Sequence, residues 1–99
     1  SGHVFTALFC ANDETAVGAL SFFQEHGVTV PGRISVLGYD DTPSAEFAAP
    51  RLSTVHIPWT EMTLNGLRWL LNQCYGHTYP VQRNFDVRVH WRASVSAVT

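Results

Sequence analysis

The feature that most constrains the fold is a strand–helix–strand pattern in the first part of the chain. Two short apolar runs, 4–11 and 34–39, are rich in β-branched and aromatic residues, which is typical of strands buried on both faces. Between them, 13–26 has apolar residues at helical spacing, with Asn12 as its N-cap and Gly27 as its stop. Such a βαβ unit is parallel and right-handed, so we expect an α/β fold with a parallel sheet.

The remaining residues continue this pattern. We expect a loop with one helical turn over 42–51, because it is polar, rich in alanine and interrupted by prolines. A third short strand follows over 52–57, and a second helix over 60–75. Apolar and polar residues alternate over 85–92, which predicts a final strand with one face in solvent. The apolar face of the second helix consists of Leu67, Leu70, Leu71 and Cys74.

Composition excludes several classes of protein. With 99 residues, 45% of them hydrophobic and 14% charged, the sequence describes one small globular domain. The net charge is −2 and no basic block is present, so the chain lacks the electrostatic footprint of a nucleic-acid binder. All six cationic residues are arginines, which excludes a phosphate-loop lysine and Schiff-base chemistry.

Other features bear on environment and metal binding. Cys10 and Cys74 are too few for a disulfide framework or a zinc site, so we expect two reduced core thiols. The five histidines lack ligand spacing; we interpret them as surface or strand-face residues and expect no metal and no other cofactor. No apolar run reaches eighteen residues, and Ser1-Gly2-His3 lacks the features of a signal peptide, so we expect neither a membrane span nor a secretory leader.

Three residues follow the expected strands where an open parallel sheet binds ligands. Asn12 follows the first strand, Asp40 the second and Trp59 the third. If the first two strands are neighbours, their ends lie ~5 Å apart, and an amide and a carboxylate could hold one small ligand. An indole adds a flat apolar surface. Paired polar groups above an aromatic ring suit the hydroxyls and C–H face of a sugar-like polyol.

Each of these residues also has a purely structural interpretation. Asn12 and Asp13 are good helix caps, and Asp40-Asp41 could form a solvated turn. Trp59 could pack on Leu64 as a helix-start staple.

Two enzymatic alternatives are weaker. A carboxylate pair for glycoside hydrolysis could come from Asp13, Glu14, Asp40 and Asp41, but no sequence feature raises the pKa of one of them. A phosphate-accepting receiver domain also ends strands in aspartate, but normally carries a lysine that this chain lacks. We therefore expect a binding protein and not an enzyme.

Four segments resemble one family. The strings ALFCANDETAVGAL, GVTVPGRISVLGYDD and PRLSTVHIPWTEM occur in this order, and VHWRAS follows near the end. Together they resemble the effector-binding half of bacterial LacI/GalR transcriptional repressors. The resemblance implies a three-layer, periplasmic-binding-protein-like fold, of which 1–99 is part of the C-terminal lobe. It implies that 58–82 crosses the hinge toward a first lobe outside this chain, and that a helix-turn-helix outside the chain binds operator DNA.

The resemblance also assigns residues. Asn12 and Asp40 match the positions that hydrogen-bond sugar hydroxyls, and Trp59 matches an aromatic ring that packs on the sugar. Ile57 stands where some members place a polar ligand contact. A homodimer, or a higher homo-oligomer, would form through Val17, Phe22, Ser44, Ala45 and Ala48.

The function implied is a cytoplasmic repressor that senses a small effector, which these contacts suggest is a sugar, and changes its affinity for operator DNA. A periplasmic sugar-binding protein of a transport system has the same fold and is the alternative. The GYDD and PRLSTV strings favour the regulator.

Overall fold

A computed structural model describes residues 4–97 of the chain. The described residues form two compact units. The first contains the chain up to His56 and again from Arg88 onward, and the second contains Ile57–Val87. The start of the chain, Ser1-Gly2-His3, lies outside the described residues, so the expectations about it stay predictions.

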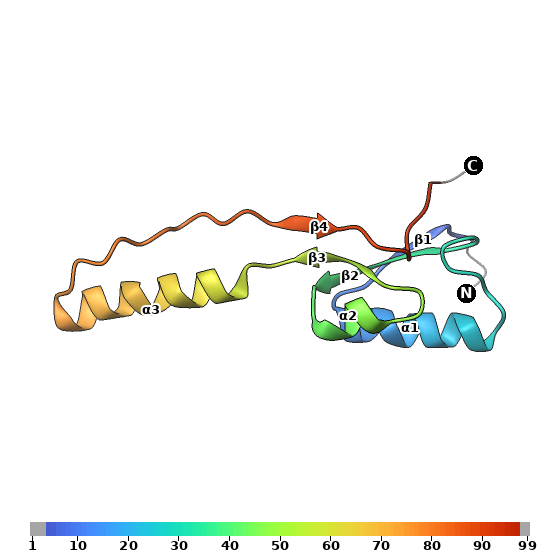
Figure 1. The fold of residues 1–99 in the computed structure, drawn as a ribbon, viewed down its shortest axis with the longest axis horizontal. Helices are drawn as coiled ribbons and strands as arrows, with labels where there is room; N and C mark the ends of the chain where they lie inside the picture. Colours follow the sequence, from blue (N-terminus) through green and yellow to red (C-terminus); the bar gives the residue numbers. More distant parts are fainter. Residues whose placement is uncertain (1–3, 98–99) are drawn as a thin grey trace. The chain divides into compact units, whose positions relative to one another are not determined.

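The first unit is built on a four-stranded sheet in the order β1-β2-β3-β4 (Figure 1). Its strands are β1 (Ala7–Phe9), β2 (Ser35–Asp40), β3 (Ser53–His56) and β4 (Arg88–His90). The first three are parallel, and β4 runs antiparallel to β3. The prediction of an α/β fold with a parallel sheet is therefore confirmed, with one antiparallel strand added by the returning chain.

Two helices pack on the same face of this sheet, as Figure 1 shows: α1 (Asp13–Glu25) and α2 (Pro43–Phe47). The helix α1 begins where predicted, because Asn12 Oδ1 accepts a hydrogen bond of 2.8 Å from the Thr15 amide. It ends before Gly27, which has a φ of +69° that suits glycine. The short helix α2 is the predicted helical turn within the loop.

The core of the first unit lies between these helices and the sheet. Val36, Leu52 and Ala16 are fully buried there. Phe23 faces the core, whereas its neighbour Phe22 is 54% exposed. The other core residues are Cys10, Leu20, Ile34 and Ala45.

Three sequence predictions need correction. The first strand is shorter than 4–11 and is not buried on both faces: Phe9, which points away from α1, is 63% exposed because no helix of this unit covers that face among the described residues. The final strand spans only Arg88–His90 and is exposed throughout. It pairs with β3, which has only four residues, and this limits the length of the pairing. Only Cys10 is a core thiol; Cys74 is exposed on the second helix.

The second unit contains the helix α3 (Trp59–Tyr75) and an extended segment that returns along it. Gly76, at a φ of +69°, ends the helix as predicted. Two side-chain amides hold the returning segment: Asn72 exchanges two hydrogen bonds of 2.9 Å with the backbone of Tyr79, and Asn65 Oδ1 accepts one of 2.7 Å from the Gln82 amide. Within 4–97, no helix has the length and apolar character needed to cross a membrane.

Candidate functional site

The carboxyl ends of β1 and β2 carry Asn12 and Asp40. The two strands are parallel neighbours, with Phe9 opposite Leu37, and the Cys10 amide extends the pairing by a 2.8 Å bond to the Leu37 carbonyl. The condition under which Asn12 and Asp40 could share one ligand, that the two strands are neighbours, is therefore met. Asn12 follows β1 and Asp40 is the last residue of β2, so both lie at the same edge of the sheet.

The backbone at this edge turns sharply. Asp40 and Asp41 have φ values of +109° and +57°, a region that aspartate tolerates better than most side chains but that still costs free energy. Such conformations are common at ligand-binding edges. Asn12 uses its Oδ1 as the cap of α1, and its Nδ2 group is the part of the amide that a ligand could bind.

Asp13 has a structural role. Its carboxylate is fully buried and accepts hydrogen bonds from the Thr42 amide (2.6 Å), the Thr42 hydroxyl (3.1 Å) and the Thr54 hydroxyl (2.6 Å). These bonds join the first turn of α1 to Thr42, the residue before α2, and to Thr54 within β3. Gly38 faces this carboxylate so closely that a Cβ atom would overlap Asp13 Oδ1. Asp13 is therefore not available as half of a catalytic carboxylate pair.

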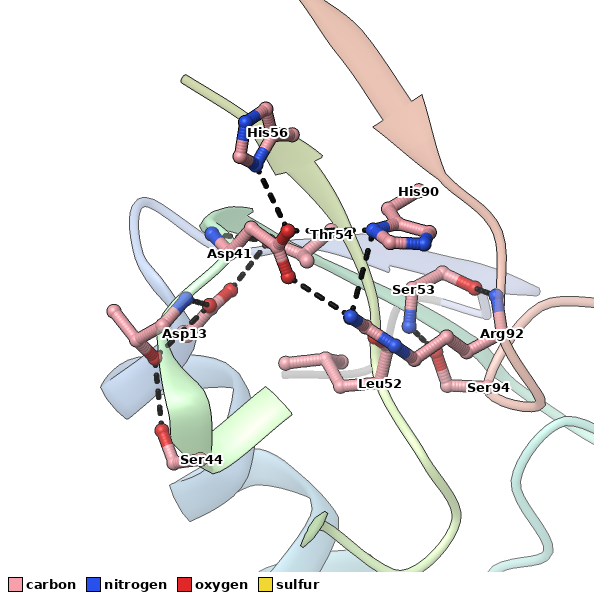
Figure 2. Close-up of polar contacts among 11 residues, drawn as sticks. Asp13, Asp41, Ser44, Leu52, Ser53, Thr54, His56, His90, Arg92 and Ser94 are labelled. Atoms are coloured by element: carbon pink, nitrogen blue, oxygen red, sulfur yellow. Dashed lines mark hydrogen bonds and ion pairs between the residues drawn. The ribbon is translucent and has the colours of Figure 1, made fainter. Parts of the chain in front are cut away.

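A second polar cluster surrounds Asp41, as Figure 2 shows. Its Oδ2 accepts from Nδ1 of His56 at 2.9 Å and of His90 at 3.3 Å, and its Oδ1 accepts from Arg92 Nη2 at 3.0 Å. Burial by itself raises the pKa of Asp41, but the hydrogen bonds from His56, Arg92 and His90 outweigh it and hold the pKa below its ordinary value. The carboxylate is thus ionised at neutral pH.

Sequence reasoning missed this cluster. Its members come from the end of β2, from β3 and from the returning strand, so they are far apart in the sequence. The one signal in the sequence was that His56 and His90 lie on two expected strands that could pair. Only the register of β3 and β4 shows that both rings reach the same carboxylate. The histidines are exposed strand residues, as predicted, and they have a specific partner.

Trp59 belongs to the second unit, where it is the first residue of α3. Its indole is 53% exposed, and its backbone amide donates a 2.8 Å hydrogen bond to the Ile57 carbonyl. An exposed ring at the start of a helix is available for stacking, and its role in a ligand site stays a prediction.

The predicted dimer residues lie on α1 and around α2. Val17 and Ala48 line one hollow of about 130 Å³, so the structure brings these two together. Phe22 and Ser44 are exposed. Ala45 is a correction: it is fully buried in the core, so its side chain cannot contact another chain.

Comparison with known proteins shows which family has this architecture. Residues 3–95 match the family described as "Periplasmic binding protein-like domain". The chain is 36% identical over 96 residues to the transcriptional regulator AscG of Escherichia coli, covering 97% of this chain. The chain belongs to the LacI/GalR family. The resemblance found in the sequence is thereby confirmed.

Solved structures of family members agree. A LacI-family regulator from Burkholderia phymatum has a TM-score of 0.87 and 57% identity, over 94% of this chain and 34% of that one. A LacI-family regulator from Lactobacillus casei with bound sucrose has a TM-score of 0.85 and 34% identity, over 91% of this chain and 33% of that one. This LacI/GalR chain spans 29% of the length of AscG, so it corresponds to about a third of such a regulator.

Proposed function

We propose that the chain is the effector-sensing and dimerisation part of a bacterial transcriptional repressor. The observation that carries the proposal is the pair of neighbouring parallel strands, β1 and β2, that end in Asn12 and Asp40. This arrangement occurs in a chain whose relatives are transcriptional regulators. Those relatives favour regulation over sugar transport, and over enzymatic activity.

The ligand we propose is a small polyol, most simply a sugar. The Asn12 Nδ2 group can donate, and the Asp40 carboxylate can accept two hydrogen bonds, which suits neighbouring hydroxyls. Trp59 supplies an aromatic surface for the C–H face of the ring. The Lactobacillus casei relative, whose structure contains sucrose, supports this ligand class.

The mechanism we propose is allosteric and involves no bond chemistry. The effector closes the cleft between two lobes by bridging Asn12 and Asp40 to groups on the other lobe. It shifts DNA binding only through its different affinities for the open and closed arrangements, by about 1–3 kcal/mol in typical switches.

The proposal also assigns partners. Residues 58–82 would cross the hinge and pack on a first lobe, which suits the exposed apolar face of α3. Val17, Phe22, Ser44 and Ala48 would form the contact between two copies. A DNA-binding domain elsewhere in a longer cytoplasmic protein would bind the operator. This chain covers 29% of AscG, which leaves room for such a domain in a protein of that length.

The test is an operator-release assay on the full-length product of the reading frame. Asp40→Ala and Asn12→Ser should each abolish release by the sugar that a thermal-shift screen identifies; serine keeps the helix cap while removing the amide. Glu25→Ala, an exposed carboxylate at the far end of α1, is the matched control and should respond normally. An unchanged response in both site variants would remove these residues from the effector site.

A further inference from the structure

A hollow on the edge of the sheet is not used by the proposed effector site. It has a volume of about 380 Å³ and lies over the paired ends of β3 and β4, with Asp41 among its lining residues. His56 and Arg88 are opposite each other in the antiparallel register. The remaining lining residues are Val89 and His90.

The charges around this hollow are unequal. Its one lining carboxylate, Asp41, is already paired with the Arg92 guanidinium, which also donates a 2.9 Å hydrogen bond to the Leu52 carbonyl. Arg88 also lines the hollow, and among residues 4–97 no ion pair joins it to a carboxylate. Arg88 is therefore a cation of the lining with no ion-pair partner among residues 4–97, while Asp40 lies opposite His56 in the register of β2 and β3.

The two imidazoles add further polar groups beside Arg88. Because an ionised carboxylate only accepts hydrogen bonds, His56 donates its Nδ1 proton to Asp41. His90 Nδ1 lies 3.3 Å from Asp41 Oδ2, to which it can donate, and 3.5 Å from Arg92 Nη2, which can donate to it. Each ring then has Nε2 for another partner, and the side chains are 50% and 57% exposed. A second proton on either ring turns Nε2 into a donor without breaking the bond to Asp41.

A metal ion is not what this cluster fits. Two free Nε2 atoms resemble half of a metal site, but within the described part of the chain no three His, Cys, Asp or Glu residues are grouped to hold one. What the hollow offers is positive charge with forked donors, which is the chemistry that binds phosphate and carboxylate groups.

We propose that this hollow is an accessory oxyanion site, in which Arg88 binds a phosphate or carboxylate group and His56 and His90 strengthen the binding. The location gives the site a consequence. The chain leaves the first unit directly after His56 and re-enters it at Arg88. An anion bound by both His56 and Arg88 would link the end of β3 to the start of β4, at the two points where the chain passes from one unit to the other.

The first experiment titrates the ¹⁵N-labelled chain with inorganic phosphate or with acetate at constant ionic strength, and follows the imidazole signals of His56 and His90. We expect saturable shifts, and Arg88→Gln should weaken binding about fivefold or more. Arg68→Gln, which removes an exposed arginine of α3, should not change it. The stronger of the two anions identifies the ligand class. Shifts that do not saturate, or an Arg88→Gln variant that binds equally well, would mean an adventitious ion only.

The second experiment measures sulfate binding at one constant pH, to the native chain and to a variant in which His56 and His90 are both replaced by glutamine. The charged groups that face the rings are Asp41, Arg92 and Arg88, with Asp40 opposite His56 in the register of β2 and β3. The double variant should bind sulfate several-fold more weakly than the native chain and keep the Arg88 contribution; equal binding by both chains contradicts the role of the histidines.

The two proposals fail separately. Asn12→Ser should lose the effector response in the operator-release assay and keep sulfate binding within about twofold of the native chain. Arg88→Gln should lose sulfate binding and keep the effector response in the operator-release assay. Loss of anion binding in Asn12→Ser would show that the hollow is not an independent site.

Discussion

The two units of this chain differ in how their apolar residues are used. The first unit buries Val36, Leu52 and Ala16 completely between α1 and the sheet. In the second, Ile57–Val87, the buried residues are Ile57 and Asn65, and five large apolar side chains of α3 are 46–53% exposed: Trp59, Leu64, Leu67, Trp69 and Leu70. The first unit therefore contains its own core.

The difference teaches how each unit is stabilised. The helix α1 is held by apolar burial and by the Asp13 carboxylate, whereas α3 is held by its own backbone bonds and the amides of Asn65 and Asn72. A helix with an exposed apolar face of this size is typical of one that packs on another part of a larger protein. The proposed first lobe supplies such a partner.

The largest expected effect contrasts one leucine in each unit. Leu52→Ala should lower the free energy of unfolding of the chain by about 2–5 kcal/mol, because it leaves a cavity in the core. Leu67→Ala on α3 should change it by less than about 0.5 kcal/mol, since that side chain is 52% exposed. Urea denaturation measures both. Equal losses would contradict the difference between the units.

A smaller effect is expected at the buried polar residue of the first unit. Asp13→Ala should cost about 1–3 kcal/mol, because the Thr54 hydroxyl and the Thr42 amide lose their acceptor in a buried position. Asp13→Asn keeps an acceptor oxygen and is the control, with a smaller loss. If both variants unfold at the native urea concentration, the hydrogen bonds of Asp13 do not stabilise the fold.

The Asp41 cluster predicts a dependence on pH. Because folding lowers the pKa of Asp41 from its ordinary 3.8, its stabilisation is fully present above that value and is lost as the pH falls through the lower folded pKa. The native chain should lose stability below about pH 4 more steeply than Asp41→Asn. Urea denaturation across this range tests it, with the exposed Asp86→Asn as a control that keeps the native slope.

The smallest effect lies in α3. Gly66 is within the helix with open space around its Cα, so Gly66→Ala should stabilise the chain by up to about 1 kcal/mol. Gly76→Ala should have the opposite sign, because an alanine is strained at a φ of +69°. Circular dichroism and thermal denaturation distinguish the two. Stabilisation by both would mean that the end of α3 does not need the left-handed conformation.

Local patterns predicted the elements because each has a local cause. The extents of α1 and α3 came within about two residues, since Asn12 caps one helix and glycines end both. The strands other than β2 were predicted too long, because an apolar run shows which residues can be buried and not where a partner strand ends. The parallel neighbours β1 and β2 were anticipated, and with them the common edge of Asn12 and Asp40.

The sequence by itself determined the alternation of strands and helices, the caps and stops of the helices and the family strings. Only the tertiary structure decided which carboxylates are structural and which are available. Asp13 and Asp41 look alike in the sequence, yet one is buried among threonine donors and the other joins His56, His90 and Arg92. The physical reason is register: the pairing of β2, β3 and β4 sets which distant side chains meet, and no local pattern encodes that pairing.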